Sequence, residues 1–231
     1  MKQATLLTLL VSLAACTAID YTSPEFPAAA LDHQTVAVLP VEMLFTGKAP
    51  KGLTADDILA IEEGESLAFQ ATLYNYLLDR SDTRSRRPIW VAIQPIDLTN
   101  QLLSEEGLLI RETWTLPAED LAEVLEVDAV VRTRVRKTRY LSDLASFGID
   151  VGVHVLLEVL DEEHAWLLPW GPRTYDVYAE GELVTADEGT LLWKVAVNRE
   201  TNWTQPANDV VRGITRKLAK KFPYRGEIAP G

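Results

Sequence analysis

The chain has 231 residues, of which 47% are hydrophobic and 24% are charged, and its formal net charge is -12 at pH 7. This composition is typical of a globular domain that buries a substantial core, and one domain is expected for this length. The acidic balance excludes long-range attraction to nucleic acid, so no nucleic-acid partner is expected.

Residues 1–15 are interpreted as an export signal. Lys2 precedes an apolar run that is too short to cross a bilayer as a permanent helix and that ends at Ala15. Cys16 follows and is the only cysteine of the chain. A lone thiol in an oxidising compartment would stay unpaired, so lipid attachment explains both the position and the solitude of Cys16. The alternative is an ordinary signal in which a cysteine happens to stand here.

The segment Leu13-Ala-Ala-Cys16 resembles the lipobox of bacterial lipoproteins, in which the signal is cleaved just before the cysteine. The resemblance implies a covalent lipid on Cys16, and no other cofactor is expected. Because Thr17 rather than an aspartate follows, it also implies attachment to the outer membrane, on the periplasmic face. Without residues 1–15, the chain has 21 basic and 34 acidic side chains. Such a charge repels anionic surfaces, so attachment is expected to come from the lipid.

The next segment, residues 16–33, is expected to be an extended lipidated tether, because it contains Pro24 and Pro27 and shows little periodicity. The folded part is expected to be a single domain over residues 34–224. Residues 225–231 are expected to be a disordered tail.

In the first half of this domain, strands and helices are expected to alternate. The continuous apolar run at 35–41 predicts a strand that is covered on both faces. Thr54-Ala-Asp-Asp57 predicts the start of a helix that continues to about residue 78. The pattern then predicts a strand at 89–93, a helix or turn at 96–103 and a helix at 118–125. This order favours parallel strands joined by crossover helices.

The second half reads as consecutive strands, at 129–140, 149–160, 175–185 and 191–199. Their apolar residues alternate in phase, which predicts one dry face towards the core and one wet face. The dry face is expected to include Val131, Val135, Val177, Ala179, Leu183, Leu191, Trp193, Val195 and Val197. A helix at 206–222 carries an apolar stripe that should pack on it. The sequence therefore predicts an α+β fold: a mixed sheet with crossover helices, then an antiparallel meander, with a C-terminal helix on the sheet.

Three arginines, Arg132, Arg134 and Arg136, are expected on the wet face. By themselves they invite a nucleic-acid interpretation. However, Glu180, Glu182 and other acidic residues are expected on the same face. Electrostatic pairing between neighbouring strands is therefore the better account of the three arginines, although they can also present a sheet face to a partner.

Three segments resemble the family of bacterial periplasmic lipoproteins that includes the curli-secretion lipoprotein, related in fold to the amino-terminal domain of TolB. The segments are Val36-Ala-Val-Leu-Pro40, Asp120-Leu-Ala-Glu-Val-Leu-Glu-Val-Asp-Ala-Val-Val131 and Leu183-Val-Thr-Ala-Asp-Glu-Gly-Thr-Leu-Leu-Trp193. With the lipobox and the closing helix they occur in the order of the family. The chain departs from the pattern at Arg132, where members commonly carry glycine, and in the turn at 187–190. The resemblance implies a role in the cell envelope.

The segment from Trp166 to Pro172 contains a second tryptophan, Trp170, in an expected inter-strand loop. Exposed aromatic patches are often contact sites, which favours binding of a partner or of another subunit. The alternative is that the loop folds back and caps the core.

No recognisable catalytic or metal-binding motif occurs in the sequence. The three histidines stand at no metal-ligand spacing, and there is no phosphate loop or Gly-x-Ser-x-Gly element. The protein is therefore not expected to be an enzyme. It is expected to be a non-catalytic interaction or assembly component of the cell envelope, which binds a protein partner or forms a homo-oligomer. The alternatives are a subunit of a curli-type secretion channel, a periplasmic activator of a cell-wall synthase and a hydrolase.

Overall fold

The computed structural model describes residues 20–46, 54–82, 87–137, 175–201 and 207–226. The elements in chain order are β1 (Asp20–Thr22), α1 (Phe26–Asp32), β2 (Thr35–Val38), β3 (Glu42–Phe45), α2 (Ala55–Ser81), β4 (Ala92–Ile93), α3 (Ile96–Glu105), the 3-10 helix η1 (Glu112–Trp114), α4 (Ala118–Val124), β5 (Ala129–Lys137), β6 (Tyr175–Thr185), β7 (Leu191–Thr201) and α6 (Ala207–Lys221). The strands form one mixed sheet in the order β1-β7-β6-β5-β2-β4, and β3 also pairs with β5. The predicted α+β fold is confirmed.

The first half of the sheet is parallel, as predicted. β2 lies between β4 and β5 and runs parallel to both. After Pro40 the chain continues along β5 as β3, again parallel. The predicted burial of both faces of β2 is also confirmed, because Val36 and Val38 belong to the core on one face and Ala37 to a second core on the other.

Helix α2 begins where the sequence predicts. The Thr54 side chain accepts a hydrogen bond from the Asp57 backbone N–H, and the Asp57 carboxylate accepts one from the Thr54 N–H, which together form a capping box. This arrangement satisfies backbone donors that the first helical turn otherwise leaves without partners. Among the described residues, no helix is long and apolar enough to cross a bilayer.

The second half of the sheet is antiparallel. β5 pairs directly with β6, from Ala129 opposite Thr185 to Arg136 opposite Tyr178, and β6 pairs with β7. The predicted strand at 149–160 lies outside the described residues. Both edges of β5 are occupied by described strands, β6 on one edge and β2 and β3 on the other.

The prediction of the dry face is wrong for one residue, Leu191. The β6–β7 register shifts after Leu183, which lies opposite Trp193, whereas Val184 lies opposite Leu191. The extra residue, Leu192, turns into the main core. Leu191 therefore points to the other face, because inserting one residue reverses the side-chain alternation beyond it.

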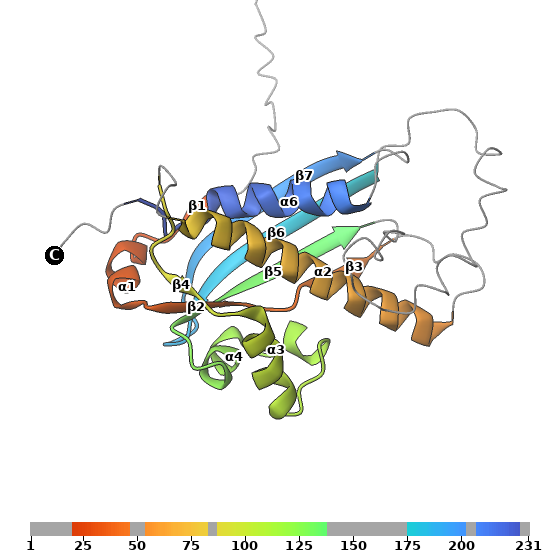
Figure 1. The fold of residues 1–231 in the computed structure, drawn as a ribbon, viewed down its shortest axis with the longest axis horizontal. Coiled ribbons are helices and arrows are strands. Elements are labelled where there is room, and N and C mark those ends of the chain that lie inside the picture. Colours follow the sequence, from red (N-terminus) through yellow and green to blue (C-terminus); the bar gives the residue numbers. More distant parts are fainter. Residues whose placement is uncertain (1–19, 47–53, 83–86, 138–174, 202–206, 227–231) are drawn as a thin grey trace, which may run out of the picture.

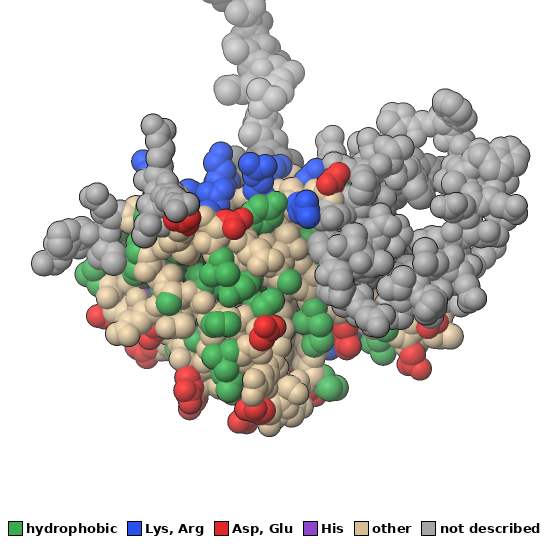
Figure 2. Space-filling view, in the orientation of Figure 1, with side chains coloured by type: hydrophobic (Ala, Val, Ile, Leu, Met, Phe, Trp, Pro, Cys, Tyr) green, Lys and Arg blue, Asp and Glu red, His purple; other side chains and the backbone are tan. Residues whose placement is uncertain are grey.

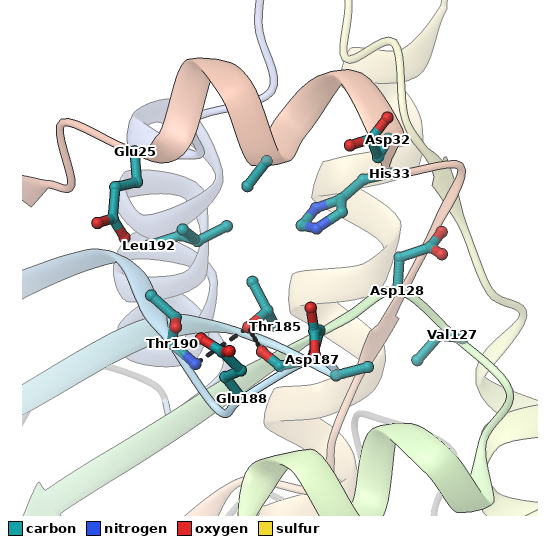
Figure 3. Close-up of a pocket in the computed structure, with 12 residues that line it drawn as sticks. Glu25, Asp32, His33, Val127, Asp128, Thr185, Asp187, Glu188, Thr190 and Leu192 are labelled. Atoms are coloured by element: carbon teal, nitrogen blue, oxygen red, sulfur yellow. Dashed lines mark hydrogen bonds between the residues drawn. The ribbon is translucent and has the colours of Figure 1, made fainter.

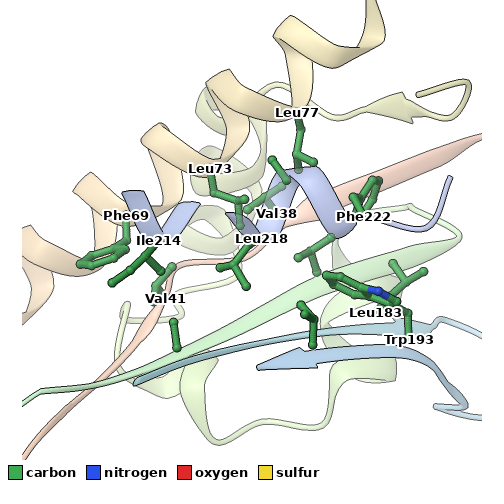
Figure 4. Close-up of a cluster of buried hydrophobic side chains, with 14 of the residues drawn as sticks. Val38, Val41, Phe69, Leu73, Leu77, Leu183, Trp193, Ile214, Leu218 and Phe222 are labelled. Carbon is green, nitrogen blue, oxygen red and sulfur yellow. The ribbon is translucent and has the colours of Figure 1, made fainter. Parts of the chain in front are cut away.

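The dry face is covered by α2 and α6, which lie side by side across the sheet (Figure 1). Figure 4 shows their apolar side chains meeting those of the strands. The residues labelled there are Val38, Val41, Phe69, Leu73, Leu77, Leu183, Trp193, Ile214, Leu218 and Phe222. The stripe predicted for the C-terminal helix is thus confirmed as its core-facing side.

The described helices cover only part of the opposite face. α4 packs against β5 and β6 and α3 against β2, with Leu121, Leu125 and Val130 in a second, smaller core. They lie on the other side of the sheet from α2 and α6 in Figure 1. The remaining part of this face carries the charged residues of β5, β6 and β7.

The chain on either side of the expected domain is more ordered than predicted. Instead of an extended tether, β1 pairs with the edge strand β7, and Phe26 in α1 packs in a T-shaped contact on Tyr224. At the other end, Arg225 forms an isolated bridge with Ile89. Residues 16–19 and 227–231 lie outside the described residues.

A charged pair is buried beneath α2. Lys137, the last residue of β5, points into the dry face and forms an ion pair with Glu65, and both side chains are 0% exposed. Burial lowers the pKa of the Lys137 ammonium well below its ordinary value. At this depth only a contacting carboxylate can keep the ammonium charged, so the two residues depend on each other.

Candidate functional site

The part of the second sheet face that no described helix covers is the strongest candidate for a functional surface. We call it the open face. It consists of Glu42, Leu44, Arg132, Arg134, Arg136, Tyr178, Glu180, Glu182, Lys194 and Asn198. Strand alternation places all of them opposite the residues that pack under α2 and α6.

Opposite charges on the open face lie on neighbouring strands. Arg132 is opposite Glu182 and Arg134 is opposite Glu180 in the β5–β6 register. Lys194 on β7 lies 2.6 Å from a Glu180 carboxylate oxygen and 2.8 Å from one of Glu182. The two carboxylates hold the pKa of Lys194 above its ordinary value. The ion pairs confirm electrostatic pairing between β6 and β7 through Lys194, and the register places Arg132 and Arg134 opposite carboxylates on β6.

Arg134 has a partner that the sequence did not reveal. Its guanidinium lies 2.6 Å from the carboxylate of Glu42, which stands opposite it on the parallel strand β3. The hydrogen bond to Glu42 raises the pKa of Arg134. The alternation of Glu42 with the buried Met43 is the signal for this placement, but only the β3–β5 pairing brings the two charges together.

The three arginines differ in their surroundings. Arg132 is half-buried, its pKa is lowered by burial, and it donates to the Leu116 carbonyl oxygen just before α4. It therefore helps to hold the edge of the α4 layer. Arg136 is exposed, and its guanidinium lies 5.0 Å from the centre of the Tyr178 ring in a cation–π contact. Arg134 is also exposed, but Glu42 holds its guanidinium, so Arg136 with Tyr178 is the combination that best suits a partner.

The charges of the open face nearly cancel. Four cationic residues, Arg132, Arg134, Arg136 and Lys194, stand among the three carboxylates of Glu42, Glu180 and Glu182. This balance contrasts with the strongly acidic chain as a whole. Another protein can therefore approach this face without the repulsion that much of the surface would exert.

The other predicted site residues cannot be placed. Cys16, Trp166 and Trp170 lie outside the described residues. The expectation of lipid on Cys16 and of a contact through the two tryptophans therefore stays a prediction.

A pocket of about 350 Å³ opens at the amino ends of β2 and β5 (Figure 3). Carboxylates of Glu25, Asp32 and Glu188 surround it, together with His33. Asp128 also lines it, but its carboxylate already accepts hydrogen bonds from the backbone N–H groups of Gln34 and Thr35, at 2.7 and 2.8 Å.

Two residues of this pocket make hydrogen bonds that stabilise the fold. Nδ1 of His33 shares a hydrogen bond with the hydroxyl of Tyr224, which belongs to the core. Within the described ranges, no three His, Cys, Asp or Glu side chains are arranged to hold a metal ion. Asp128 thus stabilises the start of β2, and His33 stabilises the end of α1.

We expect acid to destabilise the protein through His33. Burial lowers the pKa of His33 from its ordinary value of 6.5, against the opposing effect of Asp128 and Asp32. As the pH falls through this region, the unfolded chain binds the proton before the folded one, so the free energy of unfolding decreases. Thermal melts of wild type and His33→Gln between about pH 7 and 5 measure the effect. The variant should show the weaker pH dependence, and equal slopes would contradict the assignment.

Comparison with known proteins places the chain in no family. No protein-family model and no curated protein matches it. Among solved structures, it is similar to a PelC dodecamer from Paraburkholderia phytofirmans, with 12% identity, a TM-score of 0.43 and coverage of 91% of this chain and 98% of the other. Lipoprotein GNA1162 from Neisseria meningitidis has 12% identity and a TM-score of 0.41, over 81% and 99% of the two chains. The LpoB C-terminal domain from Salmonella enterica has 10% identity and a TM-score of 0.39, over 78% and 96%. Likenesses of this size assign no role to this chain.

Proposed function

We propose that this protein is an exported lipoprotein, attached through Cys16 to the periplasmic face of the outer membrane, and that it binds another protein through its open face without catalysing a reaction. The observation that carries the proposal is the nearly neutral open face on a strongly acidic chain. Tyrosine and arginine, which are enriched in protein–protein interfaces, stand together there as Tyr178 and Arg136.

The ordered charges favour specific recognition over general adhesion. The side chain of Lys194 is held by Glu180 and Glu182, and that of Arg134 by Glu42, so their positions are set before a partner arrives. Such preorganisation lowers the entropic cost of binding. A complementary partner would present carboxylates to Arg136 and an apolar group to Leu44, whose side chain is also exposed.

The proposed lipid site, Cys16, is separated from the fold by only a short stretch of chain. Asp20, the first residue of β1, is four residues after Cys16. Four extended residues span at most about 14 Å. If Cys16 carries lipid, β1 lies near the membrane surface, and no long linker separates the domain from the membrane.

A photo-crosslinking amino acid in place of Asn198, in living cells, tests the binding face. Asn198 is exposed and lies opposite Tyr178 on the open face. We expect one discrete crosslinked product, which disappears when Arg136→Glu is added. The matched control carries the same crosslinker at Gln101, an exposed position on α3.

The products distinguish the possible roles. A product of Asn198 that the Gln101 control does not form supports the proposal, and its mass shows whether the partner is a second copy or another protein. The same products from both positions, or none from Asn198, would overturn it. Ring-shaped oligomers in detergent extracts would instead support a subunit of a secretion channel.

A further inference from the structure

The solvent side of α6 is basic although the chain is acidic. Five exposed residues form this basic face: Arg212, Arg216, Lys217, Lys220 and Lys221. The opposite side of the helix is buried, with Val211, Ile214 and Leu218 in the main core. Apart from Asp209 in the first turn, no acidic residue occurs in the helix.

The basic charge extends beyond the helix and is separated from the acidic charge. Lys and Arg side chains gather along the upper edge of the view in Figure 2, over α6, while most Asp and Glu side chains lie below them. The guanidinium of Arg225 donates to the Lys220 carbonyl oxygen. Arg225 also lies close enough to Arg80 and Arg87 to interact with them electrostatically. The basic surface therefore continues past the end of the helix.

The basic face lies beside the point where the chain arrives from Cys16. Lys221, at the end of α6, binds the carboxylate of Asp20 in β1 with distances of 2.7 and 2.5 Å. Cys16 precedes Asp20 by four residues, which is at most about 14 Å of chain. A lipid on Cys16 and the cations of α6 would thus be close to the same membrane surface.

We propose that the basic face of α6 lies on the phosphate groups of anionic phospholipids in the membrane that holds Cys16. The inference rests on the lipid attachment proposed above. It revises the expectation, drawn from the total charge, that the protein repels anionic surfaces, because the local charge of a face governs attraction within about a Debye length, roughly 8–10 Å.

This contact would also fix the orientation of the domain. α6 covers one face of the sheet, and the open face is on the other. With α6 on the membrane, the open face turns away from the lipid towards the periplasm, where a protein partner can reach it. The lipid would supply attachment, and the helix would supply orientation.

Vesicle flotation of the full-length protein tests the proposal. Binding is compared on vesicles of phosphatidylcholine with and without phosphatidylglycerol, and the excess on the anionic vesicles is the readout. An inserted lipid or an apolar N-terminal segment contributes to both kinds of vesicle. The excess should disappear in about 1 M salt, where the screening length is about 3 Å.

Two variants with the same loss of charge locate the contact. Arg216→Gln with Lys217→Gln removes two charges from the basic face and should reduce the excess roughly thirtyfold, at about fivefold for each charge near an anionic surface. Arg134→Gln with Arg136→Gln removes two charges from the open face and should leave most of the excess. Melting temperatures of both variants confirm that each is folded.

The outcomes separate this inference from the lipid attachment. Cys16→Ser should weaken binding to both kinds of vesicle while the preference for anionic vesicles persists, and an unchanged Cys16→Ser protein would count against the attachment alone. Equal binding of wild type to both kinds of vesicle, or equal losses in the two double variants, would overturn the basic-face contact.

Discussion

Replacing Lys137 with methionine should lower the free energy of unfolding by about 3–5 kcal/mol. The substitution keeps most of the side-chain volume but leaves the carboxylate of Glu65 in the core without its counter-charge, and both residues are 0% exposed in the wild type. Removing one partner of a buried ion pair is costly because the remaining charge keeps its desolvation penalty. Urea denaturation followed by circular dichroism measures the change.

The double variant Lys137→Met with Glu65→Met is the control for this prediction. It removes both charges, so it should recover most of the stability lost in Lys137→Met. Equal destabilisation of the single and double variants would show that packing, and not charge, explains the loss.

The pH dependence of the stability of the single variant Glu65→Met is an independent test of the buried ion pair. Without the carboxylate, burial lowers the pKa of Lys137 from its ordinary value of 10.5 unopposed. The unfolded chain then binds more protons than the folded one below that value, so the stability of this variant should rise as the pH is raised towards it.

Replacing Tyr224 with alanine should cost about 3–5 kcal/mol, as expected for a large aromatic side chain removed from a core. Tyr224 is 0% exposed. The centre of its ring lies 5.1 Å from that of Phe26, 5.0 Å from that of Trp90 and 5.4 Å from that of Phe222. It thus joins α1, the segment before β4 and the end of α6, and its loss should release α1 first.

Tyr224→Phe is the matched control. It keeps the ring and removes only the hydroxyl that shares a hydrogen bond with His33, so we expect a loss of about 1 kcal/mol. Chemical denaturation compares the two variants, and hydrogen exchange of residues 26–32 reports on α1. If Tyr224→Ala is no less stable than Tyr224→Phe, the aromatic contacts do not hold the termini to the domain.

Local patterns accounted for most helices and strands but not for the two ends of the domain. α1 has only seven residues, and Pro27 in its first turn made the segment look like a linker. Proline is well tolerated at that position, so the signal was present but weak. Phe26 packs on Tyr224, nearly 200 residues further along the chain, and Ala30 lies in the same core. No local periodicity reports a contact of that separation.

The candidate surface was predicted only in part, because some of its contacts also join residues that are far apart in the sequence. Alternation placed Arg132, Arg134 and Arg136 on one face together with Glu180 and Glu182, and the antiparallel register confirms it. The role of Glu42 could not be read, because it depends on β3 running beside β5 after the long-range parallel pairing of β2. The shift at Leu191 was missed because a single extra residue in β7 leaves the hydrophobic composition unchanged.

The amino-acid sequence by itself determined the start of α2, the parallel pairing of the first strands through crossover helices, the wet and dry faces of β5 and β6, and the apolar stripe of α6. These features follow from capping and from side-chain periodicity, which act between residues close in the chain. Only the tertiary structure decided that Lys137 meets Glu65 in the core, that the terminal segments pack around Tyr224, and that the basic face of α6 lies beside the strand that follows Cys16. Those arrangements depend on which elements the sheet brings together, because burial and charge act through space across any separation in the sequence.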